Sequence, residues 1–304
     1  DAQESRGLGD VYKRQIIYLV IKMINIGLTG WGDHYSLYED LERQTDKLRT
    51  YASHFPVVEL DASYYAIQPE RNILKWINET PDKFQFIVKI HQALTLHSDY
   101  KTYADSRSEL FKQFRHMLEP LIAHHKLAMV LVQFPPWFDC TAQNINYILY
   151  VRQQLEDIPM CVEFRHQSWF NSQFKEQTLM FLTEHQIIHA VVDEPQIKDG
   201  SIPLVNRITS STAFVRYHGR NQHGWTKKDM TDQEWRDVRY LYNYNENELK
   251  DLANKVQILE QKAEKVYVVF NNNSGGHAAQ NAKTYQNILD IEYTGLAPQQ
   301  LKFF

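Results

Sequence analysis

Eight short β-rich runs recur along this chain, and an amphipathic helical stretch separates most of them. The runs are 24–30, 57–61, 84–89, 128–134, 160–164, 187–193, 213–219 and 266–272, and the helical stretches are 37–54, 109–125, 142–155, 174–185 and 248–264. Strands that alternate with helices pair in parallel, because each helix carries the chain back to the starting edge of the sheet. Eight such repeats without a linker rich in Pro, Gly or Ser predict one (β/α)8 barrel, a TIM barrel, over residues 23–304.

The sixth repeat departs from this pattern. Residues 199–211 match a helix poorly, so we expect this repeat to be degenerate. A doubly wound open sheet is the alternative α/β fold. That fold binds dinucleotides through a glycine-rich fingerprint after its first strand, and the fingerprint does not follow the run at 24–30.

The first 22 residues stand apart from the repeats. The stretch 7–15, GLGDVYKRQ, looks like translated sequencing adaptor, and the apolar run 16–22 has no small-residue cleavage site. A membrane span needs about 20 apolar residues, and a signal peptide needs a processing site. We therefore expect Met23 to be the natural start and residues 1–22 to be a non-native or disordered extension. A short additional strand or arm on the barrel is the alternative.

Composition excludes several classes of protein. The 43% hydrophobic content is ample for a large core. The 33 basic and 37 acidic residues are spread along the chain, so the net charge of −4 signals neither a nucleic-acid partner nor a membrane. The two cysteines, Cys140 and Cys161, offer neither a disulfide framework nor a CxxC metal site. We expect a cytoplasmic protein without a membrane partner.

Polar side chains stand at the ends of the predicted strands, which in a (β/α)8 barrel form the mouth where catalytic groups lie. They are Glu59, Asp61, Lys89, Gln133, Glu163, Arg165, His166, Asp193, Glu194, Arg216, His218, Asn271, Asn272 and Asn273. Side chains alternate between the two faces of a strand, so Glu163 and Arg165 share one face. If that face is the barrel interior, these groups meet at one mouth and form a site.

Seven motifs follow one another in a recognisable order. They are GLTGW (27–31), FPVVELDASYYAIQP (55–69), TPDKFQFIVKIHQALTLH (80–97), QFPPWF (133–138), VEFRHQSW (162–169), VRYHGRN (215–221) and VYVVFNNNSGGHAAQNA (266–282). In this order they resemble the DUF72 family, the YecE/YunF-like proteins also called UPF0759. The resemblance covers about residues 27–290 and implies a TIM barrel. The family's biochemical function is not established, so the chemistry has to be argued from the residues.

The predicted mouth suits acid/base chemistry. Glu59, Glu163 and Asp193 are candidate general acids or bases. A neighbouring cation lowers the pKa of a carboxyl group, so Glu163 beside Arg165 is expected to be ionised at neutral pH. His218, whose ordinary pKa lies near neutrality, is the expected proton donor.

Two alternatives stay open for the same residues. The carboxylates can form a structural ion-pair network with Lys89, Arg165 and Arg216, although burying so many charges is costly. They can also hold a divalent metal together with His218. A metal is not favoured, because the cations already offset the carboxylates and no HxxxH or HExxH spacing is present. The cofactor is therefore left undefined.

Further residues are predicted to bind the substrate. Trp31 and Tyr65 follow strands and can stack on a sugar or a base. The stretch 271–282 places Asn271, Asn272, Gly275 and Gly276 before a helix, where free NH groups suit a phosphate or a carboxylate. Ordinary capping by Ser274 or Asn273 is the alternative. The other residues predicted to bind the substrate are polar residues at the strand ends: Lys89, Gln133, Arg165, His166 and Arg216. The basic loop 217–228 is a candidate lid.

These observations predict an enzyme, a hydrolase or an isomerase, that acts on a small anionic or sugar-containing substrate at the barrel mouth. A non-catalytic module that binds a nucleotide or a phosphosugar is the first alternative, and a metal-dependent nuclease is the second. Nucleic acid is not the expected partner, because no basic face exists outside the mouth. The sequence predicts neither the identity of the substrate nor the oligomeric state.

Overall fold

The computed structural model describes residues 24–38, 46–197, 201–227 and 229–298. Its parallel strands pair in chain order, and β1 also pairs with β8, so the sheet closes into a barrel. The strands are β1 (Ile24–Thr29), β2 (Val57–Leu60), β3 (Gln85–Lys89), β4 (Leu127–Gln133), β5 (Met160–Glu163), β6 (Ile188–Asp193), β7 (Thr212–Tyr217) and β8 (Lys265–Phe270). The predicted (β/α)8 barrel is confirmed. The expectations for residues 1–22 lie outside the described residues.

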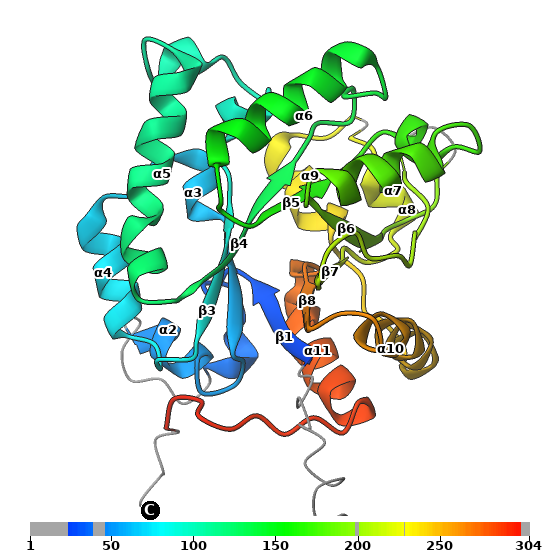
Figure 1. The fold of residues 1–304 in the computed structure, drawn as a ribbon. Helices are drawn as coiled ribbons and strands as arrows, with labels where there is room; N and C mark the ends of the chain where they lie inside the picture. Colours follow the sequence, from blue (N-terminus) through cyan, green and yellow to red (C-terminus); the bar gives the residue numbers. More distant parts are fainter. Residues whose placement is uncertain (1–23, 39–45, 198–200, 228, 299–304) are drawn as a thin grey trace, which may run out of the picture.

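Helices surround the strands on the outside of the barrel (Figure 1). They are α2 (Lys47–Tyr51), α3 (Ala62–Tyr65), α4 (Glu70–Asn78), α5 (Arg107–Ala123), α6 (Ala142–Leu155), α7 (Lys175–Glu184), α8 (Gln222–Trp225), α9 (Asp232–Arg239), α10 (Glu246–Glu260) and α11 (His277–Ile288). Short 3-10 turns are η1 (Tyr35–Leu37), η3 (Gln92–Thr95), η4 (Tyr100–Thr102), η5 (Gln167–Phe170) and η6 (Ser274–Gly276). No helix in the described part of the chain is long and apolar enough to cross a membrane.

Four of the five predicted helices are confirmed, and the one expected over 37–54 is not. Helix α6 has the predicted bounds, while α5, α7 and α10 differ from theirs by a few residues. The helix expected over 37–54 is wrong in its described parts, where only η1 and the short α2 form. The described residues between β6 and β7 contain no helix, which confirms the degenerate sixth repeat.

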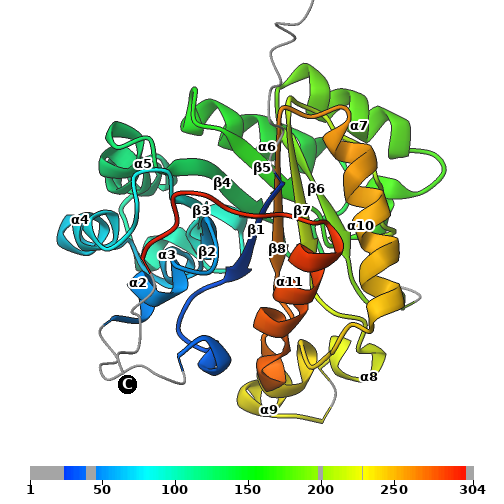
Figure 2. The same cartoon turned by 90° about the horizontal axis from the view of Figure 1, so that it is seen from below.

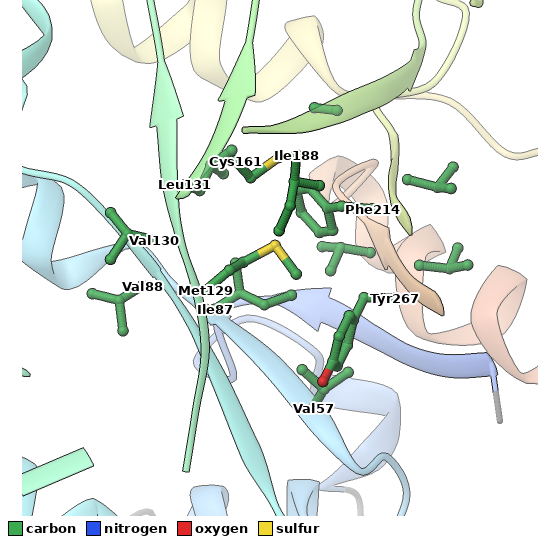
Figure 3. Close-up of a cluster of buried hydrophobic side chains, with 14 of the residues drawn as sticks. Val57, Ile87, Val88, Met129, Val130, Leu131, Cys161, Ile188, Phe214 and Tyr267 are labelled. Carbon is green, nitrogen blue, oxygen red and sulfur yellow. The ribbon is translucent and has the colours of Figure 1, made fainter. Parts of the chain in front are cut away.

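An apolar layer fills the interior of the barrel, and Figure 3 shows it in close-up. The buried side chains that gather there are Val57, Ile87, Met129, Leu131, Cys161, Ile188, Phe214 and Tyr267. Residues two positions further along a strand face the same way. Glu59 therefore follows Val57 on the inner face, and Glu163 follows Cys161. The side chains that fill the interior therefore change from apolar to ionic within two residues along β2 and β5.

The carboxyl end of the barrel is covered. Figure 2 shows α8 and α9 at the end of the barrel toward which the arrow of β1 points. Both helices belong to the connection between β7 and β8, the same connection that begins with the predicted lid loop. The ionic layer thus lies between an apolar floor and a cover made by α8 and α9.

Candidate active site

Glu163 is the centre of the ionic layer at the barrel mouth. Its Oε1 accepts hydrogen bonds from Gln133 Nε2 at 2.8 Å, Arg165 Nη1 at 3.1 Å and His218 Nε2 at 3.2 Å. Its Oε2 accepts a hydrogen bond from Arg216 Nη1. Burial alone would raise the pKa of Glu163, but Arg216, His218 and Arg165 together hold it well below the usual range. Glu163 is therefore ionised at neutral pH, as predicted.

Glu59 faces Glu163 across a shared arginine. Arg216 Nε donates to Glu59 Oε2 at 2.9 Å, and Arg216 Nη2 donates to Glu59 Oε1 at 2.6 Å. Burial raises the pKa of Glu59 to about 7, even though Arg216 acts against this rise. One guanidinium group thus joins two carboxyl groups whose pKa values are displaced in opposite directions.

His218 is a neutral imidazole in this setting. Asn271 Nδ2 donates to its Nδ1 at 2.7 Å, so the proton of the ring is on Nε2, which donates to Glu163. Burial lowers the pKa of His218 to about 3, although Glu163 acts to raise it. The prediction that His218 titrates near neutrality is wrong, because its side chain is fully buried and lies near Arg216.

Arg165 extends the cluster toward the cover. Its guanidinium lies 3.7 Å from Glu194 Oε2 and 4.5 Å from the centre of a Trp225 ring. Glu194 Oε1 accepts a hydrogen bond from the backbone N–H of Ile202 at 2.7 Å. Burial raises the pKa of Glu194 to about 7, against the effect of Arg165. Glu194 is therefore a second carboxyl group at the mouth that exchanges a proton near neutral pH.

Asp193 lies on the other face of β6 and does not join this cluster. It accepts hydrogen bonds from Arg220 Nε at 2.9 Å and Nη2 at 2.8 Å, and from the hydroxyl of Tyr244 at 2.7 Å. The reason is the alternation of side chains along β6. Ile188 faces the interior (Figure 3), so the even-numbered Glu194 faces inward and Asp193 faces outward. The sequence pattern thus pointed to Asp193, the residue next to the inward-facing Glu194.

Asn272 and His166 are likewise held away from the ionic cluster. Asn272 Nδ2 donates to the carbonyl of Tyr242 and to Asn281 Oδ1, both at 2.8 Å, which fixes the connection to α11. His166 Nδ1 accepts from the backbone N–H of Ser168 at 3.2 Å and caps η5. Both side chains thus make local structural contacts.

Lys89 and the predicted aromatic residues line the rim of the mouth. Lys89 Nζ lies 4.7 Å from the centre of the Tyr64 ring. Tyr65 packs edge-on against Tyr64 at 5.1 Å between ring centres and is 60% exposed. Trp31 packs edge-on against Trp76 at 5.3 Å. Tyr65 thus has free surface for a ligand, while Trp31 is partly used in packing.

Gly275 and Gly276 form the turn into α11. Their φ angles of 72° and 74° lie in the left-handed region, which glycine adopts without strain. Asn273 does not cap this helix through its side chain, because its amide Nδ2 donates to the carbonyl of Thr29 at 3.0 Å. The turn therefore ties the end of β8 to the end of β1.

The cover places further aromatic and basic side chains next to the ionic cluster. Trp225 and Tyr240 lie 6.0 Å and 5.9 Å from His218 between ring centres. The guanidinium of Arg239 lies 5.0 Å from the Trp225 ring and 5.1 Å from the Tyr240 ring. Trp225 lies within the predicted lid loop 217–228. Arg239 stands at no strand end, so no pattern used above could have identified it.

Metal binding is not indicated by the side chains of the mouth. Within the described ranges, no three His, Cys, Asp or Glu side chains are grouped so that they could hold a metal ion. The inward carboxylates pair with arginines, as the ion pairs of Glu59 and Glu163 show. A divalent metal stays an untested alternative.

The barrel and its mouth define a (β/α)8 protein with a buried ionic cluster at the carboxyl ends of the strands. Residues 25–302 match the family model described as "Protein of unknown function DUF72". The chain therefore belongs to the DUF72 family, which confirms the resemblance found in the motifs.

Several relatives agree with this assignment. The chain is 53% identical to the UPF0759 protein YunF of Bacillus subtilis over 93% of its length and 100% of that protein. A crystal structure of a DUF72 family protein from Enterococcus faecalis matches 92% of this chain and 100% of its own, with 38% identity and a TM-score of 0.86. One from Thermotoga maritima matches 88% of this chain and 100% of its own, with 31% identity and a TM-score of 0.76.

Proposed function

We propose that the protein is an acid/base enzyme, a hydrolase or an isomerase, whose small anionic or sugar-containing substrate binds at the barrel mouth. The observation that carries this proposal is the pair formed by Glu163 and Glu59. The two groups share Arg216, yet one pKa lies well below the usual range and the other is raised to about 7. Two titratable groups whose environments separate their pKa values are suited to act as base and acid.

Each residue has a role in this proposal. Glu163, which stays ionised, serves as the base or stabilises a developing positive charge. Glu59 is the acid, because a carboxyl group with a pKa near 7 can donate a proton at neutral pH. His218 is a positioning residue, since its neutral ring holds Glu163 through the Nε2–H bond. This assignment replaces the earlier expectation of a proton-donating His218.

The cover has to move for this chemistry to occur. Glu59 and Glu163 are 0% exposed, so a substrate reaches them only when the α8–α9 cover is displaced. The cover contacts the cluster through the stacking of Trp225 on Arg165. Such a contact can open without breaking an ion pair. Closure over a bound substrate would exclude water from the reaction.

A non-catalytic binding module is the second candidate, and one observation favours it. All the donors around Glu163 are satisfied within the protein, so the network can be stable without a substrate. In either case we expect a cytoplasmic location, which the two free cysteines Cys140 and Cys161 support.

A screen for turnover tests the proposal. Phosphorylated sugars and nucleotides would be incubated with the wild type, with Glu163→Gln and with Glu176→Gln as the matched control. Glu176 is an exposed glutamate of α7, with 66% of its side chain accessible. We expect turnover by the wild type and the control and none by Glu163→Gln. A ligand that binds without being converted favours the binding module, and equal turnover by Glu163→Gln refutes the proposal.

A further inference from the structure

We infer that Arg239 and Lys89 form a subsite for the phosphate or carboxylate group of a small ligand at the rim of the mouth. The inference rests on the proposed function for the position of the ligand. It adds the group that the ligand carries and a residue, Arg239, that the sequence did not indicate.

The two inner arginines are not available for such a group. Arg216 is bound to both Glu59 and Glu163, and Arg165 is bound to Glu163 and lies 3.7 Å from Glu194. A ligand anion could take either arginine only by displacing a buried carboxylate partner, which is costly. Arg165 and Arg216, which were predicted to bind the substrate, are therefore already paired with the protein's own carboxylates.

Arg239 is held in a different way. Its guanidinium lies over the rings of Trp235 at 4.4 Å, Trp225 at 5.0 Å and Tyr240 at 5.1 Å. Among the described residues it has no ion pair, and its buried Nε has no hydrogen-bond partner. Aromatic faces hold a guanidinium without using its N–H groups. Those N–H groups stay available for the paired hydrogen bonds that a phosphate or a carboxylate accepts.

Lys89 supplies a second cation next to the same space. Its Nζ lies over the Tyr64 ring at 4.7 Å and 3.5 Å from Asp61, whose side chain is 36% exposed. Its charge is therefore only loosely paired, and a ligand anion can compete for it.

His97 shows that these cations converge. The pKa of His97 is lowered to about 4, first by burial and then by the charges of Lys89, Arg165 and Arg239. Arg239 also acts on the hydroxyl of Tyr64, the ring on which Lys89 lies. The Tyr64 ring that carries Lys89 packs against His97 at 5.5 Å between ring centres, so Lys89 and Arg239 act on the same pair of rings.

The surroundings of this region suit a small ligand with an anionic group. Glu59 and Glu194, with pKa values raised to about 7, are partly protonated at neutral pH, so the cations exceed the ionised carboxylates. The rings of Tyr64 and Tyr240 can pack against a sugar ring. A phosphorylated or carboxylated sugar combines both requirements.

Binding of inorganic phosphate tests the subsite. The dissociation constant would be measured by calorimetry at constant ionic strength for the wild type, Arg239→Gln, Arg239→Lys and Lys89→Met. Arg207→Gln is the matched control, because this arginine is 55% exposed and pairs with Glu176 on the surface. We expect Arg239→Gln and Lys89→Met to weaken phosphate binding about tenfold or more, the loss of a charge-assisted hydrogen bond. Arg239→Lys should retain part of the affinity, and the control should bind as the wild type does.

Two results would overturn the inference. These are a wild type that does not bind phosphate, whether or not it binds duplex DNA, and an unchanged dissociation constant in Arg239→Gln. If Arg239→Gln does not fold, an unchanged dissociation constant for phosphate in Lys89→Met would likewise overturn the inference. Loss of turnover in Glu163→Gln would still support the proposed function in each case, so the two failures are distinguishable.

Discussion

Replacing Glu163 by Gln removes the charge on which the ionic cluster converges. The glutamine keeps the shape and one acceptor oxygen, but an NH2 group takes the place of the other oxygen. Oε1 accepts from Gln133, Arg165 and His218, and Oε2 accepts from Arg216. Whichever position the amide takes, its NH2 group points at another donor. The substitution therefore removes a charge and also leaves at least one donor of the cluster without its acceptor.

The size of the effect follows from the partners that remain. Breaking a buried ion pair typically costs about 3–5 kcal/mol. Arg216 keeps its two bonds to Glu59, and Arg165 keeps Glu194 at 3.7 Å. We therefore expect a loss near the lower end, about 3 kcal/mol of unfolding free energy. A domain with a stability of roughly 5–15 kcal/mol stays folded after such a loss.

The pH dependence of this loss is predicted by the depressed pKa of Glu163. A carboxyl group whose pKa is lower in the folded state stabilises the protein above its unfolded pKa, about 4.3 for Glu. That stabilisation is lost as the pH falls through the folded pKa. The difference between the wild type and Glu163→Gln should be constant from about pH 6 to 8 and shrink below about pH 4.

Urea unfolding and turnover, both measured on Glu163→Gln, distinguish a structural from a catalytic role of Glu163. A purely structural Glu163 lowers stability, and activity then falls only with the folded fraction. A catalytic Glu163 lowers the turnover of the folded protein by about 10² or more. Unchanged stability would refute the reasoning about the ion pairs. A folded variant with full turnover would refute the catalytic assignment.

Three further predictions concern other buried charges. The raised pKa of Glu59 contributes a fall in stability of up to about 1.4 kcal/mol per unit as the pH rises from about 4 to 7, and Glu59→Gln should remove this contribution in urea titrations. Asp193→Asn should lower stability by about 1–3 kcal/mol through weaker bonds to Arg220, while turnover per folded molecule stays unchanged; a selective loss of turnover would contradict its outward position. Lys126 Nζ donates to the carbonyls of Ile77, Thr80 and Pro81. Lys126→Met should therefore lower the unfolding free energy by roughly 3 kcal/mol, and an unchanged melting temperature would contradict this.

The alternation of side chains explains which site residues the sequence could predict. The two-residue alternation predicted that Glu163 and Arg165 share one face of their strand, and that Arg216 and His218 share one face of theirs. The structure brings all four side chains together. The same counting failed in β6, where every residue is buried. A parallel strand in a barrel is covered on both faces, so hydrophobicity does not distinguish inner from outer positions. The pairing of β6 with β7, which sets Val192 beside Arg216, and the interior position of Ile188 (Figure 3) identify Glu194 as the inward carboxylate.

Length explains which helices the sequence could predict. Helix α6 covers 14 residues, enough for several turns of apolar periodicity. Helix α8 has four residues and α9 has eight, too few for such a pattern to stand out. Both lie at the mouth, where Trp225 and Arg239 stack on other side chains. Contacts of this kind join segments that are distant in the sequence, so they were not visible before the fold was known.

The cover also explains why the proton affinities of the site could not be predicted from residue types. Burial is the largest cause of the pKa shifts of Glu59, Glu194 and His218. Trp225 and Tyr240 supply part of that burial, since both rings lie within about 6 Å of His218. Displacing the cover admits water and moves these pKa values back toward their ordinary range. The cover that hides the cluster from substrate therefore also raises the pKa of Glu59 and lowers that of His218, so closure of the cover and the protonation of the site are coupled.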